Sequence, residues 1–101
     1  MERCVIACRN CQIEMPKDHP CVLCCYDCGQ ICNFALVVNL NNSFLECALL
    51  DLCINACNFC VLECSKHMKH HDVCKECVAA CKQCITECQK QKMESLSDTF
   101  S

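Results

Sequence analysis

The stretch from Cys74 to Cys88, CKECVAACKQCITEC, places five cysteines at spacings of three and four residues. That is the spacing of one face of an α-helix, where a soluble protein normally places Leu, Ile or Val. Thiols on such a face could fill a core, form disulfides, carry out redox chemistry or bind soft metal ions. The rest of the sequence discriminates among these four roles.

The same spacing recurs along the chain, which has 18 Cys but only one Gly and two Pro among its 101 residues. Four stripes result: Cys4, Cys8 and Cys11; Cys21, Cys25, Cys28 and Cys32, with Cys24 beside them; Cys47, Cys53, Cys57, Cys60 and Cys64, with Leu50 between the first two; and Cys74, Cys77, Cys81, Cys84 and Cys88. Charged and amide residues lie mostly off the stripes, so the thiols are expected to face inward.

Four helices are needed to position these stripes. We expect them at about residues 2–15, 18–39, 43–67 and 70–92, with Asp18 as an N-cap, Pro20 in a first turn, and Ser43 with Glu46 as a capping box. Short connections favour antiparallel neighbours. The predicted fold is all-α, an antiparallel up-down four-helix bundle with a Cys-lined core over residues 1–92, followed by a disordered tail at 93–101.

Composition limits the function classes. A net charge of −3 and the absence of Trp give no indication of nucleic-acid binding. We find no uninterrupted apolar run that suggests a membrane span, and the start MERCVIACRN lacks the apolar core of a signal peptide. We therefore expect a cytoplasmic protein that binds neither nucleic acid nor membrane, with reduced thiols.

Core filling and disulfides explain the thiols poorly. Replacing Leu by the smaller Cys at nearly every interior position would cost roughly 1 kcal/mol or more per site. Cysteines four residues apart on a helix have Cβ atoms about 5–6 Å apart, whereas a disulfide requires about 3.5–4.5 Å. A metal ion that bridges two sulfurs fits this wider gap.

Among metals, Cu(I) fits best. Zinc prefers four ligands on knuckles and turns, and iron–sulfur clusters use Cys runs in loops, whereas these CxxC pairs lie within helices. Cu(I) is soft, selects thiolates and needs no tetrahedral site. One Cu(I) per thiolate also leaves the core neutral, while separate zinc sites with four thiolates would each carry a charge of about −2.

Softer, more accessible ligands gather at one end of the predicted bundle. Extending the stripes by helical steps leads to Met15, His67 with Met68, and His71 with His70, while His19 begins the second helix. In an up-down bundle these residues share one end. We interpret them as entrance ligands that pass Cu(I) inward to the thiols.

The segment ECSKHMKHHDVCKECVAACKQCITEC and the CxxxC-lined helices resemble the cytosolic bacterial copper storage proteins. The resemblance covers about residues 4–92 and implies a Cys-filled bundle that holds many Cu(I) ions, with His near the open end and assembly as a tetramer. The short first helix and Leu50 depart from the pattern and imply a lower capacity.

We therefore predict a Cu(I) storage and detoxification protein that is not an enzyme, with delivery by a copper chaperone as one possible source of its copper. Two alternatives stay open at this point. A zinc or general thiolate buffer would bind roughly one ion per four sulfurs. A thiol redox protein would need one exposed cysteine with a low pKa, and no CxxC pair stands out as that site.

Overall fold

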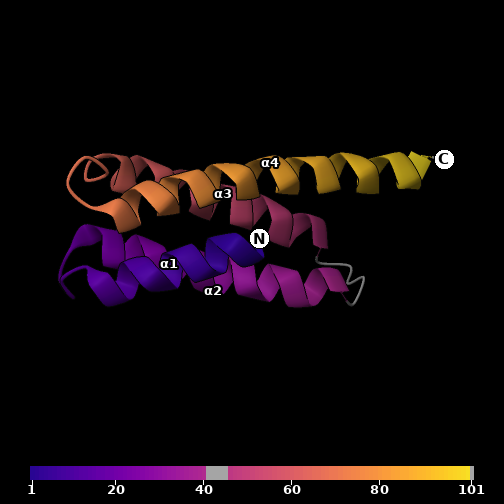
Figure 1. The fold of residues 1–101 in the computed structure, drawn as a ribbon. Helices are drawn as coiled ribbons and strands as arrows, with labels where there is room; N and C mark the ends of the chain where they lie inside the picture. The colour runs from indigo at the N-terminus through magenta and orange to yellow at the C-terminus, as the bar shows by residue number, and fades with distance from the viewer. Residues whose placement is uncertain (41–45, 101) are drawn as a thin grey trace.

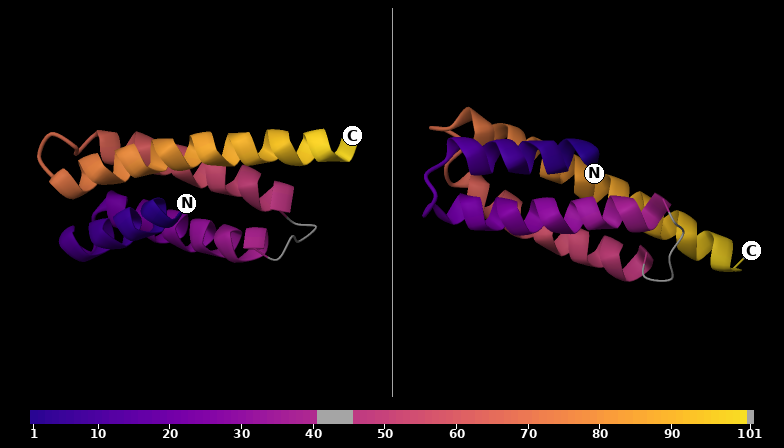
Figure 2. Two further views of the ribbon diagram at one scale, coloured as in Figure 1. Left: turned by 45° about the vertical axis from the view of Figure 1, so that its right-hand side comes forward. Right: turned by 90° about the horizontal axis from the view of Figure 1, so that it is seen from below.

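Four helices make up most of the chain: α1 (Glu2–Glu14), α2 (Pro20–Leu40), α3 (Glu46–Ser65) and α4 (Asp72–Phe100). The structure is a computed structural model that describes the backbone of residues 1–40 and 46–100 and the side chains of 1–37 and 46–94. The helices run up and down in an elongated bundle of 48 × 20 × 16 Å, with α1 and α4 on one face and α2 and α3 on the other (Figures 1 and 2). The predicted fold class is confirmed.

Local signals explain most helix boundaries. Helix α1 ends where Met15 turns to an extended conformation (φ −91°, ψ 152°), as the residue before a proline prefers. Pro20 opens α2, and the N–H of Cys21 donates a hydrogen bond of 3.1 Å to Nδ1 of His19. The N-cap is therefore His19 and the expectation of Asp18 is wrong, because a proline at the first helical position places the cap directly before it. The capping box at Ser43 lies outside the described residues.

Helix α4 continues to Phe100, past the end expected near Lys92 (Figure 1). Nothing in the segment MESLSDTF interrupts a helix, because it has no Gly or Pro and contains the good helix formers Met, Glu and Leu. The predicted boundary of the helix was therefore wrong. The division into a bundle at 1–92 and a tail at 93–101 stays a prediction.

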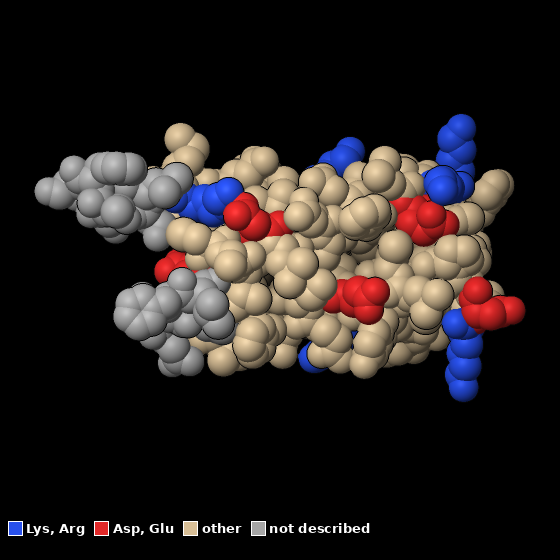
Figure 3. Space-filling model, turned by 180° about the vertical axis from the view of Figure 1, so that it is seen from behind, with Lys and Arg blue, Asp and Glu red and all other residues tan. Residues whose placement is uncertain are grey.

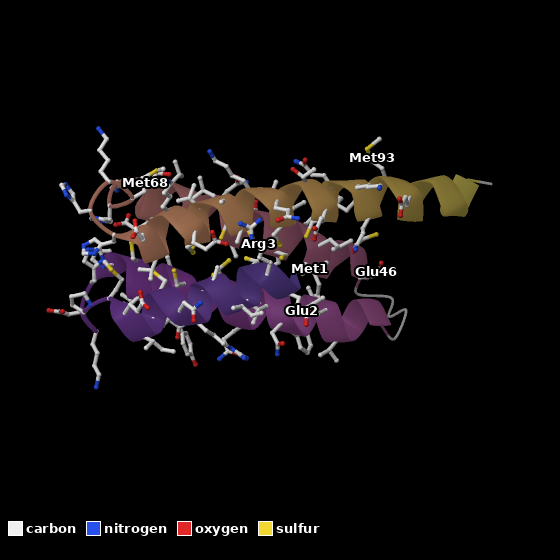
Figure 4. The ribbon with its side chains drawn as sticks, viewed as in Figure 1. Met1, Glu2, Arg3, Glu46, Met68 and Met93 are labelled. Atoms are coloured by element: carbon white, nitrogen blue, oxygen red, sulfur yellow. The ribbon has the colours of Figure 1, made fainter. Side chains whose placement is uncertain are left out.

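The core consists mainly of thiols. Sixteen of the eighteen cysteines are buried, and Leu50, at 1% exposure, is the largest fully buried side chain. No charged or polar residue is buried among the described side chains. Because α1 is short, Met1 lies midway along the bundle and α1 covers only the end nearest the α1–α2 connection (Figure 4).

Two helical segments, Pro20–Val37 and Glu46–Ser65, are long and apolar enough to cross a membrane by length and composition alone, with mean hydropathies of 1.3 and 1.6. The sequence-based expectation counted only uninterrupted apolar runs and did not find them. Cysteine scores as apolar and raises both values, and here most thiols of both segments line the bundle interior, with Cys24 and Cys47 half-buried. This feature is thus weak evidence for a membrane protein.

Candidate metal centre

Each helix contributes its predicted stripe of thiols to the interior except at Cys47, and Cys24 lies beside its stripe as expected. Cys24 is half-buried in a groove between α2 and α3, where its Sγ lies 3.9 Å from the carbonyl oxygen of Phe59. Cys47 is also half-buried, so its assignment to the buried stripe of α3 was wrong. Six residues separate Cys47 from Cys53, which is about 240° around a helix, whereas Leu50 continues the stripe.

The buried sulfurs form a continuous column along the bundle axis. Neighbouring Sγ atoms are 3.4–4.0 Å apart, as in the pairs Cys60–Cys77 at 3.4 Å and Cys28–Cys81 at 4.0 Å. Cys32 and Cys53 approach to 2.8 Å. All of these distances exceed the S–S bond of about 2.05 Å. They suit thiolates that share metal ions.

Four sets of thiols, which we call cages 1 to 4, each take one cysteine from every helix, and the sulfurs of a cage all lie within 4.8 Å of one another. Numbered from the histidine end, their members are Cys8, Cys25, Cys60 and Cys77; Cys8, Cys28, Cys60 and Cys81; Cys4, Cys28, Cys57 and Cys81; and Cys4, Cys32, Cys57 and Cys84. A further set of three, Cys11, Cys25 and Cys64, extends the column toward that end. These groups have the donor type and spacing for many soft metal ions.

Two different effects shift the pKa values of the thiols. Burial raises the pKa of Cys24 to about 11 and that of Cys74 to about 12. Within the column, hydrogen bonds from Cys28 and its neighbours lower the pKa of Cys4, and hydrogen bonds with Cys25 and others raise that of Cys8. Because the thiolate is the metal ligand, loading has to release these protons.

Two of the four histidines meet at the end of the bundle where α1 connects to α2 and α3 to α4. The rings of His19 and His67 pack edge to face with centroids 4.3 Å apart. Nδ1 of His19 accepts the capping hydrogen bond from the N–H of Cys21, so His19 positions the start of α2. Nε2 of His67 is buried and lacks a hydrogen-bond partner among the described residues.

The other predicted entrance residues lie at the same end but differ in exposure. Met15 is buried at 4% exposure, and Met68 is half-buried against the core; Figure 4 labels Met68 at the α3–α4 connection. His70 and His71 are exposed, and their N–H groups both donate to the carbonyl oxygen of His67. The structure thus gathers His19, His67, Met15 and Met68 near the column and leaves His70 and His71 at the surface.

Comparison with known families connects this column to a function. A model of the copper storage protein (Csp) family matches residues 1–93. The chain belongs to the copper storage protein family. Neither the curated proteins nor the solved structures gave a match to the chain. The match covers α1 to α3 and α4 as far as residue 93, so it includes every thiol of the column.

Membership in the copper storage family explains the core composition and narrows the alternatives. Proteins of this family store copper and are not enzymes. The CxxC pairs Cys74/Cys77 and Cys81/Cys84 are 0–1% exposed, and a redox centre needs an accessible thiolate. Storage accounts for many equivalent buried thiols.

Sequence reasoning missed one residue at the histidine end. Oε1 of Glu63 lies 3.7 Å from Nε2 of His67 and its other oxygen accepts a hydrogen bond of 3.1 Å from Lys66, which lowers the pKa of the Glu63 carboxyl. The spacing of four residues between Glu63 and His67 could have indicated this contact. A carboxylate beside one imidazole nitrogen can orient the ring for a ligand at the other.

Proposed function

We propose that this protein stores many Cu(I) ions in the cytoplasm, bound by the thiolates of the column, and thereby contributes to copper homeostasis and detoxification. The observation that carries the proposal is the continuity of the column. Sulfurs from all four helices follow one another at 3.4–4.0 Å, so each thiolate can bridge two ions. A cytoplasmic location accords with eighteen cysteines kept as thiols.

The oxidation state follows from the donor chemistry. Thiolates are soft ligands that favour Cu(I), and Cu(I) accepts two or three sulfurs without a fixed geometry. A monovalent ion also balances one thiolate, which matters in a core without buried cations among the described side chains. Eighteen thiols thus suggest a capacity on the order of one Cu(I) per thiolate.

We further propose that copper enters at the histidine end, with delivery by a copper chaperone as one possible source. Exposed His70 and His71 make first contact, and His67, His19, Met15 and Met68 pass the ion to the thiols at Cys11, Cys64 and Cys74. Imidazole and thioether bind Cu(I) less strongly than thiolate, so transfer runs inward. The gradient of exposure from His70 to buried Met15 supports this direction.

We also propose a homo-oligomer, a tetramer by family resemblance, that buries the face formed by α2 and α3. Uncharged side chains cover most of this face, and a few acidic side chains interrupt it (Figure 3). It exposes Leu23 and Phe59 at 67% each and Leu62 at 66%, which is unusual for a monomer surface. Light scattering checks the assembly, and Phe59→Lys should yield monomers; an unchanged mass would exclude this face.

An anaerobic titration of the reduced protein with Cu(I) in the presence of a competing chelator tests the storage proposal. We expect saturation near the thiol count of 18, with the chelator free of copper until then. Saturation at about four or five ions, with equal or tighter binding of Zn²⁺, would instead establish a zinc buffer.

A further inference from the structure

The cages of the column have the size of a tetrahedral metal–thiolate site. In cage 3, Cys4 lies 3.8 Å from Cys28, 3.8 Å from Cys57 and 3.6 Å from Cys81. In cage 1, the Sγ atoms of Cys25, Cys60 and Cys77 are 3.4–3.6 Å from one another. A regular tetrahedron around a zinc ion with Zn–S bonds of about 2.3 Å has edges of about 3.8 Å. Each cage can therefore hold a divalent ion without rearrangement of the helices.

Consecutive cages are not independent, because they share thiols. Cages 1 and 2 share Cys8 and Cys60, and cages 3 and 4 share Cys4 and Cys57. Cages 2 and 3 share Cys28 and Cys81. The column is thus a row of tetrahedra that share edges, and the shared pair alternates between α1/α3 and α2/α4.

Edge sharing brings neighbouring cage centres close together. For tetrahedral edges of about 3.8 Å, two neighbouring centres are about 2.7 Å apart. At equal distance, two divalent ions repel each other about four times as strongly as two monovalent ions. Two divalent ions in neighbouring cages would also divide six thiolates between them, since two are shared, so each would have less negative charge than a complete tetrathiolate site provides.

We infer that the column also binds soft divalent ions such as Zn²⁺, and that these ions occupy only cages without a common thiol. Among the four cages the allowed pairs are 1 and 3, 2 and 4, and 1 and 4, so two ions fill them. Cu(I) escapes this restriction because it carries one charge and needs only two or three sulfurs. The same thiols thus hold few divalent ions or many copper ions, and copper displaces the divalent ions as it accumulates.

The sharing of thiolates also changes the charge balance of zinc bound in the column. Separate zinc sites would each carry about −2, but cages that share thiolates cannot be counted separately. Discrimination between the two metals then depends on the spacing of the cages. The rule that occupied cages share no thiol requires only the thiol geometry, so it can hold or fail independently of the entrance and of copper storage itself.

X-ray absorption of the reduced, zinc-loaded protein is the first test. We expect four sulfurs at about 2.3 Å around each zinc and no zinc neighbour near 2.7 Å. The copper-loaded protein should show copper neighbours near that shorter spacing. Zinc neighbours near 2.7 Å, or zinc with nitrogen and oxygen ligands in place of four sulfurs, would overturn the inference.

Two single substitutions provide a matched pair for the count. Cys4→Ala removes cages 3 and 4 and leaves cages 1 and 2, which share thiols, so zinc bound per chain should fall by one ion. Cys28→Ala removes cages 2 and 3 and leaves cages 1 and 4, which share none, so the zinc count should stay unchanged. Each variant removes one buried thiol, and both should lose similar, small amounts of copper capacity.

Zinc is counted by competition with a chromophoric chelator, and circular dichroism verifies that both variants remain helical. Both substitutions are made in a chain that also carries Cys53→Ala and Cys64→Ala. Without this change, the group Cys32, Cys53 and Cys84, 2.8–3.9 Å apart, and the group Cys11, Cys25 and Cys64 could bind zinc in competition with the end cages and remove the contrast. Equal zinc losses in both variants, or no loss in Cys4→Ala, would overturn the rule that occupied cages share no thiol. Should either variant lose its helix, Cys57→Ala and Cys81→Ala provide the same contrast, because they remove the same cages.

Discussion

The thiol column and the histidine end use different ligands and hold them in different ways. Column cysteines lie on helices, are buried and contact one another across all four helices. The candidate ligands of the histidine end lie on the connections and at helix ends, where His19 caps α2 and His70 and His71 are exposed. The contrast supports the division of labour that we propose, in which helix packing determines how much metal is held and the connections determine how metal gains access.

The physical basis of this division is the cost of moving each region. Displacing a column cysteine requires a helix to shift within a packed interior, whereas residues in an exposed turn can change rotamer or backbone conformation locally. Storage needs fixed, closely spaced thiols, and exchange needs ligands that can move. Substitutions in the two regions should therefore affect different quantities.

The largest effect should follow removal of one complete cage at the centre of the column. We expect the combined change of Cys4, Cys28, Cys57 and Cys81 to Ala to lower copper capacity by about four ions, since each thiolate balances about one Cu(I). Metal analysis of the saturated, reduced protein measures this loss. An unchanged capacity would show that these thiols are core filler.

Substitution at the histidine end should change a rate. His67→Ala, His70→Ala and His71→Ala together should slow copper loading several-fold and leave final capacity nearly unchanged, because inward transfer loses its accessible ligands. Stopped-flow mixing with a Cu(I)–chelator complex measures the rate. Lys69→Ala, an exposed residue of the same connection, is the control. A large fall in capacity would make these histidines storage ligands and remove the contrast.

The sequence predicted the inward stripes well and the relations between helices poorly. Spacings of three and four residues determine which face of a helix carries Cys25 or Cys81, because the helical repeat is constant. They do not determine how far one helix slides along another, so the composition of the cages required the structure. Cys47 and the contact between Glu63 and His67 are different cases, because both follow from the helical repeat and could have been predicted from spacing.

Proton release distinguishes the metal-free column from the loaded one. Burial raises the pKa of Cys24 from 9.0 to about 11 and that of Cys74 from 9.0 to about 12, so the folded chain binds more protons than the unfolded chain above about pH 9. This stabilisation is complete below pH 9.0 and is lost as pH rises toward the folded values. We therefore expect the urea midpoint of the reduced, metal-free protein to fall from about pH 8 to about pH 10.5.

The copper-loaded protein provides the contrast to that measurement. Metal binding has already displaced the protons of its thiols, so its urea midpoint should change little over the same alkaline range. The urea midpoint should fall at acid pH, where protons compete with the metal for the thiolates. Equal alkaline losses in both forms would mean that groups other than buried thiols are responsible.

The smallest effect is expected where the column stops. Leu50 occupies a stripe position next to Cys53 and is fully buried, so Leu50→Cys adds a thiol in line with the column and should raise copper capacity by about one ion. The same change should destabilise the metal-free protein by about 1–3 kcal/mol, because a smaller side chain leaves a cavity. Leu52→Cys, at a position 47% exposed on the same helix, is the matched control. If Leu52→Cys gains as much copper as Leu50→Cys, copper capacity depends on the number of thiols alone. If only Leu50→Cys gains copper, position within the packed column determines the capacity. Leu50 then lowers the copper capacity of the protein and stabilises its metal-free form.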